Sequence, residues 1–290
     1  MPPAFLLRVR EIVRKESIQD GGTGRLSAKE KILEEIRQFE GQAGIFFRSL
    51  MTGASWGFRE KEQYLAASIV KLPLMAAILL WESRGETGFE DRITIREDQK
   101  IPGCGAVQFL NGDVTLTVGE LSSLMITISD SCATNALFRH YGADAIRSAF
   151  RELGMHGTQF NREYWDEEKE KRGINNYFVP EEMAELLERM HNRTLINPQA
   201  SCRLEDLLRQ QQINHKMGGL LPMEFPLAHK TGDEEDKAHD VGIVYTSSPF
   251  IVCFAYVGPQ MRRYEEFIRR ATLSLAEENG GIGQECLPGC

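Results

Sequence analysis

The chain has 290 residues, of which 42% are hydrophobic and 26% charged, a composition that is ordinary for a globular protein. This length is enough for one large domain or two small ones with a sizeable buried core. The net charge of −8 and the absence of a basic stripe argue against a general nucleic-acid binder. No apolar run approaches the roughly 18 residues of a membrane span, so none is expected.

The N-terminal segment contains only a very short apolar run at residues 4–7, which Arg8 and Arg10 interrupt. A secretory signal needs about 7–15 apolar residues, so we expect no signal peptide and a cytoplasmic protein. A leader removed before this sequence begins would leave the same pattern. Residues 4–15 are expected to form a small amphipathic helix. The six cysteines are scattered and do not predict a disulfide framework.

The first regular elements are a helix and a hairpin. Ser27 and Glu30 have the spacing of a capping box, and apolar residues recur after them at helical spacing. Residues 43–47 and 54–58 are typical of two short strands joined by a turn. A nearly all-apolar helix is then predicted over residues 68–83, which makes it central to the fold.

The middle of the chain is mainly helical. Helices are expected at residues 118–125 and 134–140, with a polar break between them. Residues 154–179 are polar and irregular, and so long a loop in a compact domain is usually functional or mobile. Pro180 opens another helix, and Asn197 caps the next.

The C-terminal part predicts three strands, at residues 227–230, 241–246 and 250–257, followed by a helix at 262–278. The predicted fold class is therefore α+β, with one antiparallel sheet flanked by terminal helices and an all-helical insert. The predicted organisation is an N-terminal extension and linker at 1–25, an α/β subdomain at 26–62 and 212–280, an all-helical subdomain at 63–211 and a flexible tail at 281–290.

A hydroxyl and an amine lie three residues apart at the start of the central helix. This spacing places Ser68 and Lys71 on one face of a helix. A serine needs a base within hydrogen-bond reach to act as a nucleophile, and a lysine in an apolar setting can supply one. The alternative is a buried helix with a capping serine and a snorkelling lysine, because this motif also occurs by chance.

Two further polar motifs follow along the chain, namely Ser129-Asp130-Ser131 and Lys230-Thr231-Gly232. The motifs S-x-x-K, S-D-N and K-T-G mark class A β-lactamases and penicillin-binding proteins, and the chain resembles this superfamily over residues 27–279. The resemblance implies a β-lactamase/transpeptidase-like fold, a small-molecule substrate, no cofactor and a monomer. The six histidines show no metal-binding spacing, so no metal site is expected. Asp130 is expected to be structural, accepting backbone N–H groups at its turn.

The resemblance implies a catalytic role for four of these residues. Ser68 would attack an amide or lactam carbonyl while Lys71, neutral when it acts, takes the proton directly or through water. The oxyanion would lie between the backbone N–H groups of Ser68 and Asp233. Ser129 would pass a proton to the leaving nitrogen beside Lys230.

Substrate binding is expected at Ser131, Asn135, Thr231, Gly232 and Asp233. Ser131 replaces the asparagine of the family motif, so a group that both donates and accepts becomes a single hydroxyl. Asn135 matches an asparagine that helps to orient the long loop. Thr231 would offer its hydroxyl to a substrate carboxylate.

The long loop would hold the residue that activates the deacylating water. In class A enzymes this is a glutamate that follows an arginine by two residues. Counting forward from Arg162 places Tyr164 there, whereas counting back from Pro180 places Glu163 there. A carboxylate is a suitable base at neutral pH and a tyrosine is not, so we predict Glu163. Asp166 is the second candidate, and the absence of any base is the remaining alternative.

The K-T-G motif runs directly into four acidic residues at 233–236. β-Lactams carry a carboxylate that family members hold near this place, often with an arginine, where this chain has Ala238 beside Lys237. Four acids should weaken the binding of an anion unless they face solvent, where salt screens them. A neutral or cationic natural substrate is therefore an alternative.

Three functions follow from these observations. The leading hypothesis is a serine β-lactam hydrolase whose acyl-enzyme at Ser68 is hydrolysed by an activated water, in β-lactam catabolism and the response to antibiotics. The second is a cytoplasmic esterase, amidase or peptidase-like hydrolase with the same fold. The third is a penicillin-binding sensor that is acylated without turnover.

Overall fold

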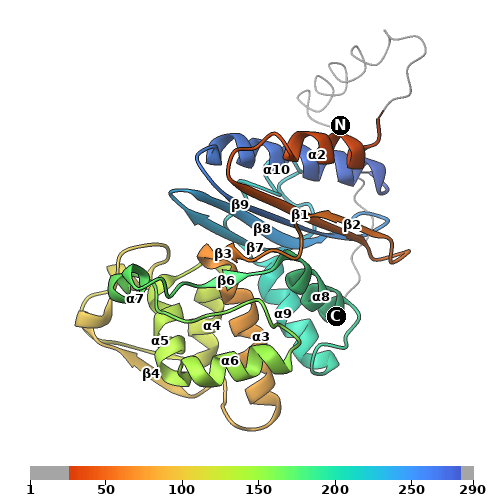
Figure 1. Cartoon of the computed structure of the whole chain (residues 1–290). Coiled ribbons are helices and arrows are strands. Elements are labelled where there is room, and N and C mark those ends of the chain that lie inside the picture. The colour runs from red at the N-terminus through yellow and green to blue at the C-terminus, as the bar shows by residue number, and fades with distance from the viewer. Residues whose placement is uncertain (1–25, 282–290) are drawn as a thin grey trace, which may run out of the picture.

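The computed structural model describes residues 26–281. The predicted helix at 4–15, the linker up to residue 25 and most of the predicted tail lie outside these residues. A β-sheet separates two helical layers: two helices cover one face, and a larger helical region lies against the other (Figure 1). In this part of the chain, no helix has the length and apolar character needed to cross a membrane.

In the described chain, one five-stranded sheet has the strand order β2-β1-β9-β8-β7. Its strands are β1 (Gln42–Ser49), β2 (Ser55–Phe58), β7 (Leu227–Glu234), β8 (Lys237–Val244) and β9 (Phe250–Val257). All neighbouring pairs are antiparallel. Because β9 pairs with β1 on one side and β8 on the other, it joins the two ends of the chain in the one sheet that the sequence predicts.

The hairpin between β7 and β8 is longer than predicted. The strand predicted to end at residue 230 continues through the acidic residues, with Asp233 opposite Ala238 and Glu234 opposite Lys237. Acidic residues are poor strand formers, but pairing with a neighbouring strand overrides this weak preference. The acidic run therefore forms the end of a hairpin.

The outer layer consists of α2 (Ala28–Ile36) and α10 (Met261–Glu278). The predicted capping box is confirmed: the Ser27 N–H donates to Glu30 at 2.8 Å, and the Glu30 N–H donates to the Ser27 hydroxyl at 3.3 Å. Alternation along β1 divides the core, since Ile45 and Phe47 pack with the terminal helices while Phe46 packs with the helical region.

The helical region is built around α3 (Lys71–Ser83), in which every residue from Lys71 to Trp81 is buried. Its other helices are α4 (Val118–Thr127), α5 (Ser131–Tyr141), α6 (Ala143–Glu152), α8 (Pro180–His191) and α9 (Pro198–Arg209). The sequence does not predict α6. The side chain of Asn197 caps α9 as predicted, accepting from the N–H of Ala200 at 2.8 Å.

The central helix begins later than predicted. Residues Ala67–Val70 form a 3₁₀ turn, η1, and the α-helix starts only at Lys71. Pro73 explains the difference, because its ring would clash with the carbonyl four residues earlier in a continuous α-helix. Ser68 thus lies in a separate turn before α3.

Short elements surround the helical region. These are β3 (Tyr64–Leu65), β4 (Arg92–Ile95), η2 (Glu97–Gln99), η3 (Val107–Phe109), β5 (Val114–Thr117), α7 (Glu167–Lys171) and β6 (Tyr177–Phe178). The long loop predicted at 154–179 contains α7 and β6, and β6 pairs with β3. The division of the chain into two subdomains stays a prediction.

One carboxylate fastens the start of the long loop. Glu182 of α8 accepts the backbone N–H groups of His156, Gly157 and Thr158, at 2.8, 2.7 and 2.8 Å. Glu182→Ala should lower the free energy of unfolding by about 2 kcal/mol, because three N–H donors lose a charged acceptor. Urea denaturation followed by circular dichroism measures the change.

The neighbouring Glu181→Ala variant is the matched control. The Glu181 carboxylate pairs only with the exposed Lys61, at 3.7 Å, so its loss should change the free energy of unfolding by no more than roughly 0.5 kcal/mol. Equal losses in the two variants would contradict the assigned anchor.

Candidate active site

Ser68 and Lys71 meet at the junction between the helical region and the sheet. The preceding residue, Ala67, has φ of +41°, a conformation that is strained for a residue with a side chain. The amine of Lys71 has no exposed surface, and its Nζ lies 3.0 Å from the Ser68 Oγ. The structure therefore brings the two predicted residues together.

Ser129 and Lys230 complete a cluster with this pair. Lys71 Nζ donates to the carbonyl of Ser129 at 2.7 Å and lies 3.0 Å from its hydroxyl. Lys230 Nζ donates to the same hydroxyl at 3.1 Å. Ser129 itself has φ of +57°, so a second strained residue presents a hydroxyl to the site. One serine hydroxyl thus connects two buried amines.

Both amines are held toward their neutral forms. Burial lowers the pKa of Lys71 to about 8. Burial, and then the nearby cations of Lys71 and Lys216, hold the pKa of Lys230 well below its usual value. A neutral Lys71 has a lone pair that can accept the Ser68 proton while its two N–H groups still donate to Ser129.

Asp130 has the structural role that its position predicts. It caps α5 by accepting the N–H of Ala133 at 2.9 Å, and its other oxygen accepts those of Ala106 and Val107 at 2.7 and 2.9 Å. These bonds fix the turn that presents Ser129 on one side and Ser131 on the other. Ser131, the first residue of α5, is 7% exposed.

Tyr164 is the long-loop residue that faces the reactive pair. Its backbone N–H donates to the Asn135 side chain at 2.9 Å, and its carbonyl accepts from the same amide at 3.0 Å. Its hydroxyl donates to the carbonyl of Ala67 at 2.8 Å, and Lys71 Nζ lies 4.6 Å from the centre of its ring. Burial raises the pKa of Tyr164, so the phenol is not a base at neutral pH.

Glu163, the predicted water-activating base, is bound to helix α5. Its carboxylate forms an ion pair with Arg139 at 2.5 Å and makes no hydrogen bond with Ser68 or Lys71. The cause lies on α5, where Asn135 and Arg139 are one turn apart and hold consecutive loop residues. The residue held beside the reactive pair is thus Tyr164, the one reached by counting forward from Arg162, and a role for Glu163 in activating water stays a prediction.

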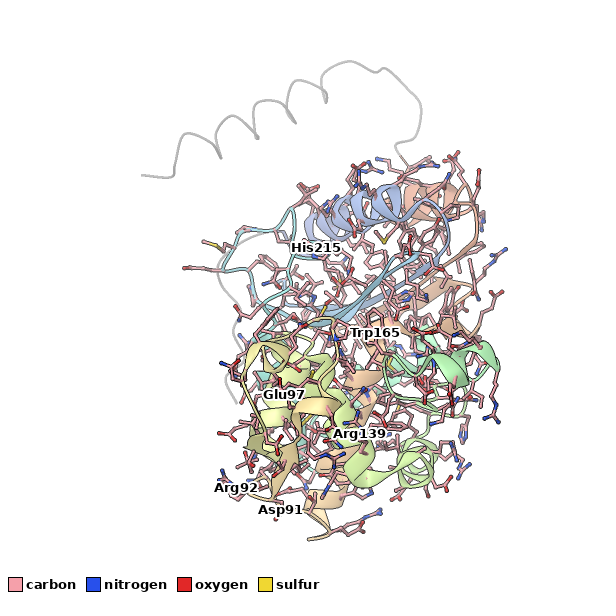
Figure 2. All side chains as sticks on the ribbon, turned by 90° about the vertical axis from the view of Figure 1, so that its left-hand side faces the viewer. Asp91, Arg92, Glu97, Arg139, Trp165 and His215 are labelled. Carbon is pink, nitrogen blue, oxygen red and sulfur yellow. The ribbon has the colours of Figure 1, made fainter. Side chains whose placement is uncertain are left out.

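The second candidate base is also engaged elsewhere. Asp166 caps α7 by accepting the N–H of Lys169 at 3.0 Å, and its carboxylate pairs with the Lys169 side chain at 3.2 Å. Figure 2 shows the intervening Trp165 at the junction of the sheet and the helical region, where it is 57% exposed. Both predicted acidic candidates thus have charged partners of their own.

The strand that carries the K-T-G motif lies close to the nucleophile's turn. A side chain at Gly232 would come within 3.0 Å of Ile69 and 3.1 Å of His239, so glycine favours this close approach. The hydroxyl of Thr231 is buried and has no hydrogen-bond partner in the structure. The carboxylate of Asp233 contacts the Nζ of Lys216.

Lys216 is a residue of the site that sequence reasoning misses. Its side chain has no exposed surface, although it lies in a polar connector with no helical or strand pattern. Nothing local distinguishes it from a solvated lysine, because its burial depends on packing against the distant β7–β8 hairpin.

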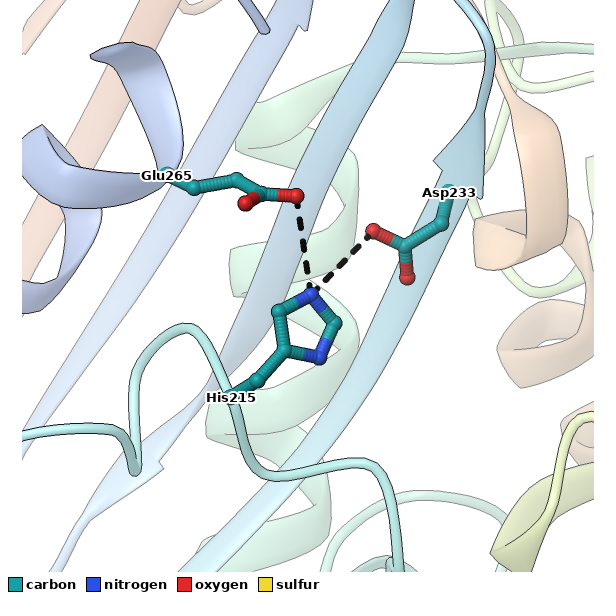
Figure 3. A group of neighbouring side chains, drawn as sticks. All are labelled: His215, Asp233 and Glu265. Atoms are coloured by element: carbon teal, nitrogen blue, oxygen red, sulfur yellow. Dashed lines mark ion pairs between the residues drawn. The ribbon is translucent and has the colours of Figure 1, made fainter. Parts of the chain in front are cut away.

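One group of described residues could hold a metal ion, namely His215, Asp233 and Glu265, whose ligand atoms lie within 4.8 Å of one another (Figure 3). The Nε2 of His215 is 3.7 Å from Asp233 and 3.6 Å from Glu265. The Asp233 oxygen nearest to His215 also binds the Lys216 ammonium, which would compete with a metal cation.

Comparison with known proteins agrees with this geometry. A family model described as the beta-lactamase enzyme family matches residues 27–278. A beta-lactamase from Rhodobacter capsulatus is 30% identical over 138 residues, which are 46% of this chain and 47% of that protein. The match thus spans about half the length of this curated relative.

Solved structures share the fold over most of the chain. The structure of PBP-A is 26% identical with a TM-score of 0.78, covering 87% of this chain and 95% of its own. A point mutant of PBP-A, solved as an acyl-enzyme complex with penicillin G, aligns equally well. A beta-lactamase from Sphaerobacter thermophilus is 25% identical with a TM-score of 0.78, covering 86% and 96%.

These findings confirm the predicted α+β fold and the resemblance that the three motifs indicate. The family match covers both the sheet and the helical region, including every residue of the cluster around Ser68. The chain belongs to the beta-lactamase enzyme family.

Proposed function

We propose that Ser68 forms an acyl-enzyme with β-lactams or related amides and esters, and that this acyl-enzyme is hydrolysed only slowly. The observation that carries the proposal is a complete acylating cluster beside a loop position filled by Tyr164. Lys71 Nζ lies 3.0 Å from Ser68 Oγ, whereas the carboxylate of Glu163 pairs with Arg139.

Acylation uses one chain of proton transfers. The neutral amine of Lys71 takes the Ser68 proton as the oxygen attacks the substrate carbonyl. Lys71 also reaches Ser129, at 3.0 Å, so the proton can pass to this hydroxyl and on to the leaving nitrogen. Lys230, at 3.1 Å, stabilises any negative charge on the Ser129 oxygen.

The oxyanion is proposed to bind the backbone N–H groups of Ser68 and Asp233. Within residues 26–281, β7 is the edge strand of the sheet and pairs with β8 alone, so part of its backbone remains available to a ligand. Thr231, Gly232 and Asp233 of this edge, with Ser131 and Asn135 of α5, remain the proposed substrate-binding residues.

Deacylation needs a water that loses a proton as it attacks. Tyr164 keeps its proton at neutral pH and uses its hydroxyl to bond the carbonyl of Ala67. The two predicted acidic candidates have other partners, Glu163 with Arg139 and Asp166 with Lys169, which favours the predicted penicillin-binding alternative over rapid turnover. The similar PBP-A mutant was solved as an acyl-enzyme complex with penicillin G.

A second candidate is the predicted esterase or amidase with a neutral substrate. The contact between Asp233 and Lys216 favours it, because this buried cation is already neutralised. The cytoplasmic location and the monomeric state stay predictions.

The first test is intact-mass spectrometry after incubation with benzylpenicillin. The wild-type chain should gain the mass of the whole penicillin, and Ser68→Ala should gain none. Lys71→Met should acylate on the order of a hundredfold or more slowly, because it lacks the base. An adduct on the Ser68→Ala chain would contradict the assigned nucleophile.

The second test compares two neighbouring loop residues. Tyr164→Glu should shorten the lifetime of the penicilloyl adduct at least about tenfold, because it adds a carboxylate where the tyrosine faces the site. Glu163→Gln is the matched control and should leave the lifetime unchanged. If Glu163→Gln instead lengthens the lifetime, Glu163 does take part in deacylation.

The third test is the pH dependence of acylation. Burial sets the pKa of Lys71 at about 8, and only the neutral amine accepts a proton. The second-order rate constant should therefore rise roughly tenfold per pH unit below this pKa and level off above it. Stopped-flow measurement with a chromogenic cephalosporin gives the profile, and a rate independent of pH across this range would contradict the role of Lys71.

A further inference from the structure

The side chains of β7 alternate between two faces of the strand, and one of these faces meets the reactive cluster. Lys230 points to the reactive cluster, so Thr231 and Asp233, which alternate with it, lie on the opposite face. Across the hairpin, Thr231 is opposite Asp240 of β8. Thr231, Asp233 and Asp240 thus lie on one face of the β7–β8 hairpin, beside the proposed substrate edge.

The side chain of Lys216 reaches this face of the hairpin. The N–H of the next residue, Met217, donates to the Asp240 carboxylate at 3.0 Å, which fixes the backbone opposite Thr231. The Lys216 amine nevertheless ends at the Asp233 carboxylate. Its amine therefore lies on the face of β7 that carries Thr231 and Asp233, and its cation is close enough to lower the pKa of Lys230.

A buried network holds this arrangement in place. The ring of His229 lies between Asp240, at 2.8 Å, and Asn214, at 2.7 Å. Asn214 belongs to the same connector as Lys216, so the segment is fixed on both sides of the lysine. The amine is therefore a preorganised part of this face of the hairpin rather than a mobile surface lysine.

Two groups on this face of the hairpin are suited to bind the carboxylate of a ligand. The ammonium of Lys216 is fully buried, and the hydroxyl of Thr231, which is 1% exposed, has no partner in the described structure. An ammonium and a free hydroxyl together form a binding site for an anionic oxygen pair. The Lys216 cation, however, is already bound by Asp233.

We propose that Asp233 acts as an internal carboxylate that competes with the carboxylate of a ligand for Lys216. This rests on the proposed function, in which the substrate lies along residues 231–233. A ligand carboxylate must displace Asp233, whereas a neutral ligand meets no such competitor. Asp233 is thus a specificity-determining residue that selects against anionic ligands.

A displaced Asp233 has a second partner close by. The ring of His215 lies 3.7 Å from the Asp233 carboxylate and also faces Glu265 at 3.6 Å (Figure 3). Asp233 is one-third exposed, so water can also solvate it once Lys216 is taken. The Asp233 carboxylate therefore has two environments available: bound to Lys216, or next to His215 and water.

The test measures binding without reaction, in chains that carry Ser68→Ala. Isothermal calorimetry gives the Kd of benzylpenicillin and of its methyl ester, which lacks the free carboxylate. Adding Asp233→Asn should tighten benzylpenicillin on the order of tenfold, because a charge-assisted hydrogen bond becomes available. The Kd of the methyl ester should not change.

Two further variants control the result. Asp236→Asn removes the same charge at the hairpin end, where the carboxylate pairs with Lys237 at 2.6 Å, and should leave both Kd values unchanged. Lys216→Met, added to Asp233→Asn, should abolish the gain without leaving an unpaired buried charge.

The proposal is overturned if Asp233→Asn tightens neither ligand or tightens both equally. It is also overturned if Asp236→Asn produces the same gain, or if no heat is detected with either ligand. Failure of the proposed function looks different: with Ser68 restored, the wild-type chain would form no penicilloyl adduct, while the carboxylate-selective gain in the Ser68→Ala chains would persist.

Discussion

The burial of one amine is the constraint on which the rest of the site depends. Lys71 begins a helix that is buried through Trp81, and loss of solvation is the main reason that its pKa falls to about 8. A buried amine must also have partners, and the carbonyl and hydroxyl of Ser129 supply them. The strained backbones of Ala67 and Ser129 present the groups that this amine needs.

The sheet supplies the second amine and the edge along which a substrate is proposed to lie. Gly232 lets β7 approach the turn of Ser68, and Lys230 reaches Ser129 from the same strand. Two cations this close disfavour each other, which helps to keep Lys230 toward its neutral form. The opposite face of the strand carries the contact between Asp233 and Lys216, which is proposed to decide whether an anionic or a neutral ligand binds.

The sequence predicts what local spacing determines. The capping box at Ser27, the strand at 250–257 and the meeting of Ser68 with Lys71 depend on residues near one another in the chain, and the structure shows all three. The sequence leaves two counts open for the long loop, Tyr164 and Glu163, because loop length says nothing about which end of the loop is the fixed reference. The side chain of Asn135 makes that choice, and the burial of Lys216 is likewise a tertiary effect.

Helix α5 sets the register of the long loop from outside the loop. Asn135 grips the backbone of residue 164 through its N–H and carbonyl, groups that any amino acid except proline offers. The placement of the loop backbone therefore depends little on which side chain residue 164 carries. A substitution at residue 164 can therefore leave the scaffold unchanged. A protein with a long-lived acyl-enzyme and one that hydrolyses it rapidly can thus differ by few residues.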